Sequence, residues 1–258
     1  MKHPMRGFVV AIVLTLVATS MRGAELALHE LSIASHGRDV FVRCHPGPGA
    51  GPLPVVVLLH GAGGFTAFSR HYESYAESFA AAGLRTCAVL YYSASDLRVV
   101  SGLNRAENSA LFQKRFMAWL ATINDVVDEL SKLPITERES LGILGFSQGA
   151  YLAVGIAGTN PRIRALAEFY GGFPGPLQSR ITELPPTFIV HGESDAVIPV
   201  QEAYAMEAAA RLRTTSVAMK LYAGAGHGFD AAKDDASAVA ARKETIEFFV
   251  RHLSRARK

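Results

Sequence analysis

The sequence predicts an α/β fold, with one mostly parallel sheet of eight strands covered by helices on both faces. Segments of strand and helix character alternate along most of the 258 residues, of which 49% are hydrophobic. Several of the strand segments are apolar without alternation, which is typical of strands buried on both faces. Right-handed crossovers between such strands give a parallel sheet with two helical layers.

A chain of this length can bury a large core, so we expect a single domain over residues 25–258. Residues 1–20 have the pattern of a secretory signal peptide, because basic residues precede an apolar run from Phe8 to Ala18 and small residues follow. The run is shorter than the roughly 20 residues of a membrane-spanning helix, which favours cleavage, within residues 20–24, over an anchor. We therefore expect a secreted or periplasmic protein.

The first two strands are expected to form an antiparallel hairpin, because both alternate in polarity around the turn Ser35-His36-Gly37-Arg38. A helix over 69–82, stopped by Gly83, separates the third and fourth strands. The polar residues 93–108 are expected to form a loop. The eight strands are predicted over 25–35, 39–47, 55–60, 84–92, 140–146, 163–170, 186–192 and 217–222.

The helix after this loop carries apolar side chains at steps of three and four from Phe112 to Leu130 and ends before Pro134. This periodicity indicates a helix face in the core. Further helices are expected directly after Ser147, over 199–212, and at the end of the chain around Phe249. The segment 171–186 is too short for a helical cap domain, so no large cap is expected.

The stretch Gly-Phe-Ser-Gln-Gly places Ser147 between the strand 140–146 and an apolar helix. A sharp turn at that point exposes the serine at the end of the strand, and Gly145 and Gly149 allow strand and helix to approach closely. The strained turn costs roughly 1–3 kcal/mol. The motif and its position predict that Ser147 is a catalytic nucleophile.

A serine nucleophile needs a base and a carboxylate, in the chain order serine, acid, histidine for this type of elbow. Asp195 and His227 follow predicted strands at the carboxyl edge of the sheet, where sites in such sheets gather. Glu193 is the alternative acid. Structural roles are expected for His60 and His191, and surface positions for His71 and His252.

The loop His-Gly-Ala-Gly-Gly over 60–64 is a candidate oxyanion hole, because it follows the first long parallel strand. The backbone N–H of Ala62, with Gly63 as the alternative, would act together with that of Gln148. A phosphate-binding loop is not indicated, since neither GxGxxG nor a terminal Gly-Lys-Ser/Thr is present.

The motifs LLHGAGG, GFSQGA, HGESDAVIP and GAGHGF occur in the order typical of the α/β-hydrolase superfamily, which the chain resembles over nearly all of its mature length. Within that superfamily it most resembles the dienelactone hydrolase family. Two departures stand out. That family often has a cysteine nucleophile in a G-x-C-x-G-G elbow and a glutamate after the oxyanion strand, whereas this chain has Ser147, Ala150 and Gly61 there.

The resemblance implies a serine hydrolase that cleaves carboxylic esters, either short-chain esters or lactones, through an acyl-enzyme. A serine peptidase, amidase or thioesterase on the same fold is the nearest alternative, and a catalytically silent binding protein is a third. Without a cap the site should be open, although the loop 93–108 leaves the same end of the sheet and a small lid there is the alternative. Apolar residues near the strand ends are candidate pocket walls: Phe65, Tyr91, Phe173, Ile198 and Phe229.

No cofactor or metal is expected, because Cys44 and Cys87 lack metal-ligand spacing. In the hydrolase architecture these cysteines lie on neighbouring antiparallel strands, where a disulfide is geometrically possible, and export would favour it. Buried free thiols are the alternative. The formal charge of +3 indicates no nucleic-acid partner. We also expect no association with the membrane once the signal peptide is removed. The partner is then a small-molecule substrate.

Overall fold

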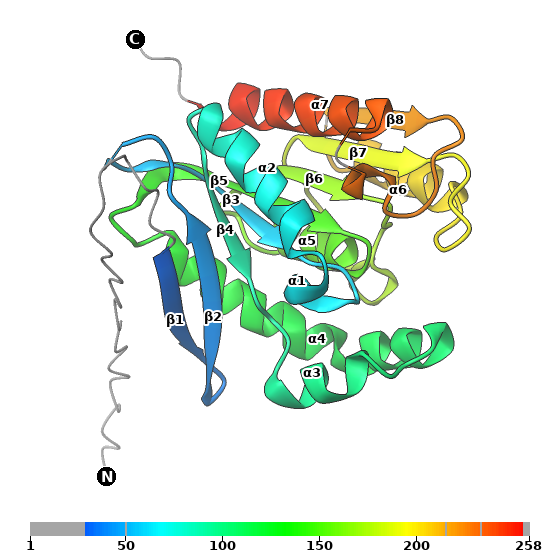
Figure 1. Ribbon diagram of the computed structural model, residues 1–258, viewed down its shortest axis with the longest axis horizontal. Helices are drawn as coiled ribbons and strands as arrows, with labels where there is room; N and C mark the ends of the chain where they lie inside the picture. The colour runs from blue at the N-terminus through cyan, green and yellow to red at the C-terminus, as the bar shows by residue number, and fades with distance from the viewer. Residues whose placement is uncertain (1–28, 50, 215, 233, 255–258) are drawn as a thin grey trace.

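The computed structural model describes residues 29–49, 51–214, 216–232 and 234–254. Across these residues, eight strands form one sheet in the order β1-β2-β4-β3-β5-β6-β7-β8 (Figure 1). The pairs β1–β2 and β2–β4 are antiparallel and the other neighbours are parallel, which confirms the predicted sheet. The strands are β1 His29–Ser35, β2 Arg38–His45, β3 Leu53–Leu59, β4 Arg85–Val89, β5 Thr136–Phe146, β6 Ile163–Phe169, β7 Thr187–Gly192 and β8 Val217–Tyr222.

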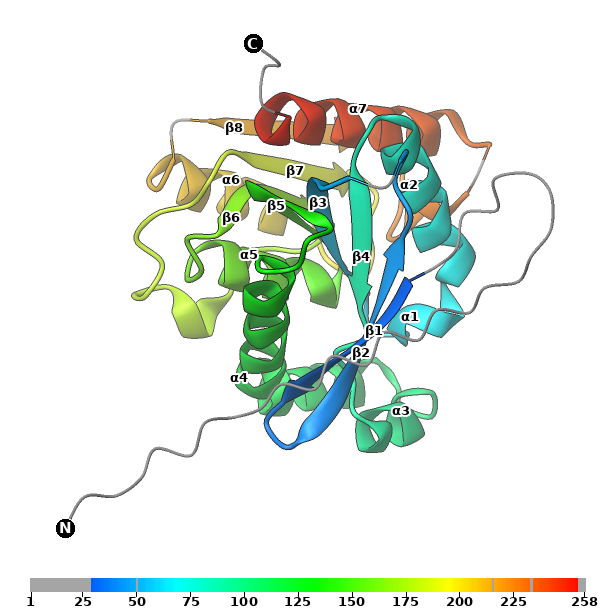
Figure 2. The same cartoon turned by 90° about the vertical axis from the view of Figure 1, so that its left-hand side faces the viewer.

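Helices cover both faces of the sheet (Figures 1 and 2). Phe79 of α2 and Phe249 of α7 belong to the core on one face, whereas Trp119 of α4, Leu152 of α5 and Met206 of α6 belong to the core on the other. Each fully buried side chain of this size stabilises the fold by about 1.5–3 kcal/mol. The helices are α1 Gly64–Ala67, α2 Ser69–Ala81, α3 Ala94–Val100, α4 Arg105–Leu130, α5 Gln148–Ala157, α6 Gln201–Arg211 and α7 Ala236–Leu253, with 3₁₀ turns η1 Gly175–Leu177 and η2 Phe229–Ala231.

The expectation of a loop over 93–108 is wrong, because this segment contains α3 and the first turn of α4. Both helices begin with a capping box. Ser93 and Asp96 satisfy each other's backbone N–H groups at the start of α3, and Asn104 and Glu107 do so at the start of α4. These reciprocal hydrogen bonds allow polar residues to start a helix. The segment has few apolar residues, so its hydrophobic pattern did not predict the two helices.

Cys44 of β2 and Cys87 of β4 lie directly opposite each other in the antiparallel register and form a disulfide. Both side chains are fully buried in the sheet core. The bond ties the hairpin of β1 and β2 to the parallel part of the sheet.

The predicted signal peptide over 1–20, with its cleavage site within 20–24, lies outside the described residues. Within the described part of the chain, no helix combines the length and hydropathy required to cross a bilayer.

Candidate active site

Four loops carry the candidate site residues. They follow the carboxyl ends of the parallel strands β3, β5, β7 and β8, which meet at one edge of the sheet. The first carries Ala62, the second Ser147, the third Asp195 and the fourth His227. Topology therefore gathers residues that are up to 165 positions apart, the difference between 227 and 62.

Ser147 occupies a sharp turn between β5 and α5, with φ 54° and ψ −119°. The left-handed backbone at a residue with a side chain stores strain, which the flanking packing maintains. A Cβ atom on Gly145 would lie 2.2 Å from the carbonyl oxygen of Gly149, and one on Gly149 would lie 2.5 Å from that of Leu59. Both elbow glycines are thus required by close backbone approach.

Ser147, His227 and Asp195 form one chain of hydrogen-bonding atoms. His227 Nε2 lies 2.9 Å from Ser147 Oγ, and His227 Nδ1 lies 2.8 Å from Asp195 Oδ2. The other oxygen, Oδ1, accepts hydrogen bonds from the backbone N–H groups of Val197 and Ile198 at 2.7 and 2.9 Å. These bonds fix the carboxylate so that Oδ2 faces the imidazole, whereas Glu193 is exposed.

Ala62 and Gln148 line the same cavity as Ser147. Gln148 is the first residue of α5, so its N–H lacks an intrahelical partner. Among the described residues the N–H of Ala62 has no backbone acceptor, while the adjacent Gly61 N–H is bound by the Tyr72 hydroxyl at 3.1 Å. A Cβ on Gly61 would lie 3.5 Å from Ser147 Cβ, which shows how closely this loop approaches the elbow.

A pair of tyrosines after β4, Tyr91 and Tyr92, connects the Gln148 side chain to the loop that carries Ala62. The side-chain Nε2 of Gln148 donates to the Tyr92 hydroxyl at 2.7 Å, and that hydroxyl donates to the Ala62 carbonyl at 3.1 Å. The Tyr91 hydroxyl donates to the His60 carbonyl at 2.7 Å, and its ring stacks on the His60 imidazole at 4.0 Å. Burial lowers the pKa of His60 to about 4, so the imidazole is neutral at pH 7 and packs against Tyr91 as an uncharged ring. His60 thus has the structural role expected of it, whereas no signal in the sequence identified Tyr92.

A second buried cluster lies behind His227. Asp230 accepts hydrogen bonds from the hydroxyls of Tyr75 and Tyr170, and His71 Nε2 lies 3.3 Å from the same carboxylate. The expectation that His71 lies at the surface is wrong, because its side chain is 7% exposed among aromatic rings. Burial lowers the pKa of His71. A single histidine in a helix pattern gave no signal of this.

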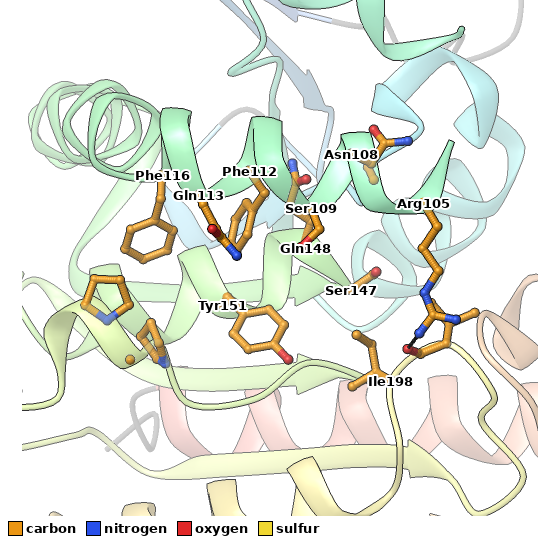
Figure 3. Close-up of a pocket in the computed structure, with 15 residues that line it drawn as sticks. Arg105, Asn108, Ser109, Phe112, Gln113, Phe116, Ser147, Gln148, Tyr151 and Ile198 are labelled. Carbon is orange, nitrogen blue, oxygen red and sulfur yellow. Dashed lines mark hydrogen bonds between the residues drawn. The ribbon is translucent and has the colours of Figure 1, made fainter. Parts of the chain in front are cut away.

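Two cavities open beside Ser147. The first, of about 680 Å³, lies between α4 and α5 and is lined by side chains of both helices and by Ile198 (Figure 3). The second, of about 530 Å³, is lined by His71, Tyr170 and His227 among others. Ligand pockets commonly have volumes in this range.

The structure places four of the five predicted pocket residues elsewhere, and only Ile198 lines the first cavity. Tyr91 is fully buried against the His60 ring, and Phe65 packs against Tyr72, with the Arg43 guanidinium over its ring. The other two, Phe173 and Phe229, are engaged by neighbouring side chains: Arg213 lies over Phe173 at 4.6 Å, and Phe229 lies 5.0 Å from Tyr222. Proximity to a strand end did not determine the side-chain direction.

The walls that sequence analysis missed come from α4 and α5. Phe112, Phe116 and Tyr151 line the first cavity (Figure 3). Phe116 is buried in the core and Phe112 packs against it, as their spacing predicts, and both rings also border the cavity. The spacing indicates burial but cannot show that a cavity adjoins the buried face.

A model of the dienelactone hydrolase family matches residues 41–253. The chain belongs to the dienelactone hydrolase family. A Yersinia pestis protein named carboxymethylenebutenolidase is 24% identical over 213 residues, which cover 78% of each chain. Family membership places this protein among the carboxylic ester hydrolases.

Solved structures share the fold of this dienelactone hydrolase family member. The dienelactone hydrolase of Anabaena variabilis is 19% identical and superposes with a TM-score of 0.68, covering 89% of this chain and 99% of that one. A dienelactone hydrolase-like promiscuous phosphotriesterase from metagenomic libraries is 18% identical, with a TM-score of 0.72 and coverage of 89% and 99%. Across the described residues, no group of three or more His, Cys, Asp and Glu is arranged to hold a metal ion.

Proposed function

We propose that this protein hydrolyses short-chain carboxylic esters or lactones through an acyl-enzyme formed on Ser147. The observation that carries the proposal is the chain of contacts from Ser147 Oγ through His227 to Asp195, at 2.9 and 2.8 Å, on a strained elbow. This is the arrangement that makes a serine hydroxyl nucleophilic.

In the first half-reaction His227 Nε2 takes the Ser147 proton while Oγ bonds to the ester carbonyl carbon. The carbonyl oxygen becomes an oxyanion, and the N–H groups of Ala62 and Gln148 are proposed to hold it, each worth about 2.7–4 kcal/mol. His227 then returns the proton to the leaving alcohol oxygen as the C–O bond breaks. Asp195 stabilises the imidazolium and maintains its tautomer.

The second half-reaction has the same steps, with water as the nucleophile in place of the serine hydroxyl. The water gives a proton to His227, adds to the acyl carbon and releases the carboxylic acid as Ser147 Oγ regains its proton. No cofactor takes part in this cycle. His227 acts as the base in both half-reactions, and only the neutral imidazole can accept the proton.

We also propose export from the cytoplasm. The pattern of residues 1–20 supports this, and so does the buried Cys44–Cys87 disulfide, since disulfides persist in oxidising compartments. Mass analysis of the protein recovered from culture medium and periplasm tests it. A mature N-terminus within residues 20–24 is expected, and an intact N-terminus on cytoplasmic protein would contradict export.

A fluorophosphonate probe followed by an ester-versus-amide panel tests the activity. Labelling confined to Ser147, with hydrolysis of nitrophenyl acetate and small lactones, is expected. Absence of labelling in folded protein would instead favour a silent binding protein, and faster cleavage of matched amides would favour a peptidase. In an acyl series from acetyl to palmitoyl, kcat/KM should be higher for short than for long chains.

A further inference from the structure

The two cavities share a boundary at Ser147. Ala62, Arg105, Asn108, Ser147 and Val197 line both. The Arg105 guanidinium, at the start of α4, donates hydrogen bonds to the carbonyls of Ala196 and Val197 and so bridges the α4 wall to the loop that carries Asp195 (Figure 3). A substrate that reaches Ser147 therefore has its ester group at this boundary and one part in each cavity.

His227 lines the second cavity and not the first, and Tyr170 and Gly228 lie beside it there. Proton transfer restricts where the alcohol part can lie. The nitrogen that removes the Ser147 proton must next protonate the leaving oxygen, so that oxygen has to come within hydrogen-bond reach of His227 Nε2. The alcohol part of the substrate therefore extends from Ser147 into the second cavity.

The acyl part then has the first cavity available to it. Arg105, Asn108, Phe112 and Phe116 follow each other at steps of three and four along α4, so the cavity runs beside this helix from its polar start to its aromatic turns (Figure 3). From Asn108 to Phe116 the helix rises about 12 Å. A phenylpropanoyl group is shorter than this run, and a palmitoyl chain is longer.

The far part of this cavity is aromatic and apolar. The Phe112 ring lies 5.3 Å from Phe116 and 5.9 Å from Tyr151 of α5, and Pro174 and Pro176 complete that wall. Aromatic rings bury large apolar areas and favour edge or offset contacts with further rings. This lining suits a compact apolar acyl group, and an aromatic one best.

We infer that the first cavity is the acyl subsite and the second the alcohol subsite, so that the preferred substrates are esters of arylalkanoic or similarly compact apolar acids. The inference rests on the proposed function. It identifies Phe112 as a specificity-determining residue on the acyl side and Phe68, which lines only the second of the two cavities and is 49% exposed, as its counterpart on the alcohol side.

The acyl-enzyme separates the two assignments, because the alcohol has left before deacylation begins. A change in the acyl subsite should alter deacylation of a given acyl group, whichever ester delivered it. A change in the alcohol subsite should alter only acylation, and only to an extent that depends on the alcohol. The two half-reactions therefore report on different cavities.

The experiment compares Phe112→Ala and Phe68→Ala by quenched flow, with intact mass used to follow formation and decay of the acyl-enzyme. The substrates are acetyl and 3-phenylpropanoyl esters of nitrophenol and of naphthol. Phe112→Leu and Phe68→Leu retain apolar contacts at each position, and the melting temperature of every variant is measured first.

For Phe112→Ala, deacylation of the phenylpropanoyl enzyme should slow at least fivefold for both alcohols, with less than a twofold change for acetyl. For Phe68→Ala, acylation by the naphthyl esters should change most and both deacylation rates should stay within twofold. The Leu variants should give smaller effects of the same kind.

The reverse pattern, or a deacylation rate unaffected by Phe112→Ala, would overturn the assignment while leaving the proposed function intact. Failure of wild-type protein to form any acyl-enzyme would instead refute the proposed function, and the subsite assignment with it.

Discussion

The hydroxyl of Tyr170 donates a 2.8 Å hydrogen bond to Asp230, and the ring of the same tyrosine lies 4.6 Å from the imidazole of His227. Tyr170 stands at the end of β6 with φ 41°, a strained conformation for a residue with a side chain. Tyr75 donates to the other oxygen of Asp230 at 2.9 Å. Burial raises the pKa of both tyrosines well above its ordinary range, so both remain donors. The cluster provides a fixed surface for the His227 ring.

Tyr170→Phe should therefore lower kcat about 5- to 30-fold with little change in KM, because losing a hydrogen bond to a carboxylate costs roughly 1–2 kcal/mol and frees the ring beside His227. Tyr75→Phe is the matched control. It removes a bond to the same carboxylate, and its ring is not in contact with His227. Steady-state kinetics on both variants, with melting temperatures, measure the difference, and equal losses of kcat would show that Tyr170 acts only through stability.

Ser147→Ala should lower ester hydrolysis by several orders of magnitude without unfolding the protein, since the members of such a triad act as a unit. Ser194→Ala, which changes an exposed serine in the loop that carries Asp195, serves as the control and should retain activity. Nitrophenyl acetate turnover and circular dichroism check both expectations. Turnover by Ser147→Ala at the wild-type rate would refute the proposed mechanism, in which Ser147 is the nucleophile.

Glu168 should make the folded state less stable as the pH rises. Burial raises the pKa of this fully enclosed carboxyl to about 8. Between the unfolded value of 4.5 and this value the folded protein holds a proton that the unfolded chain has released, so stability is greatest below the lower value and declines as the pH rises through this window. The carboxyl accepts one bond, from the Gly171 N–H, at 2.9 Å.

Glu168→Gln should remove this decline and raise the melting temperature at pH 8 by several degrees relative to wild type, with a smaller difference at pH 5. Glu183→Gln, at an exposed carboxylate that is not among the charges acting on Glu168, is the control and should leave the slope unchanged. Scanning calorimetry at both pH values measures it. Parallel stability curves for Glu168→Gln and wild type would show that the carboxyl does not retain its proton.

Reduction of the Cys44–Cys87 bond should lower the free energy of unfolding by about 2–4 kcal/mol, because it releases a constraint on the unfolded chain across a sequence separation of 43. Activity should persist, since Ser147 lies beyond the end of β5, two strands away in the sheet order. Non-reducing intact mass and denaturant titration with and without reductant test this. Two free thiols in the exported protein would contradict the disulfide.

The order of elements, the parallel sheet and the elbow could all be predicted from the amino-acid sequence. These features follow from local periodicity, from turn residues and from close backbone approach at Gly145 and Gly149, all of which are recorded in short stretches of chain. Asp195 and His227 could be nominated because a parallel sheet brings the carboxyl ends of its strands to one edge. Even the capping boxes at Ser93 and Asn104 were local signals, though the polar character of that segment masked them.

The directions of side chains between elements could not be predicted in this way, because they depend on the folded packing. Whether Tyr91 faces the core or a pocket, whether His71 is buried against Asp230, and which turns of α4 line a cavity all depend on how helices pack on the sheet. Residues far apart in the chain determine that packing. Periodicity identifies the buried face of an element, whereas the shape left between two such faces exists only after they have come together.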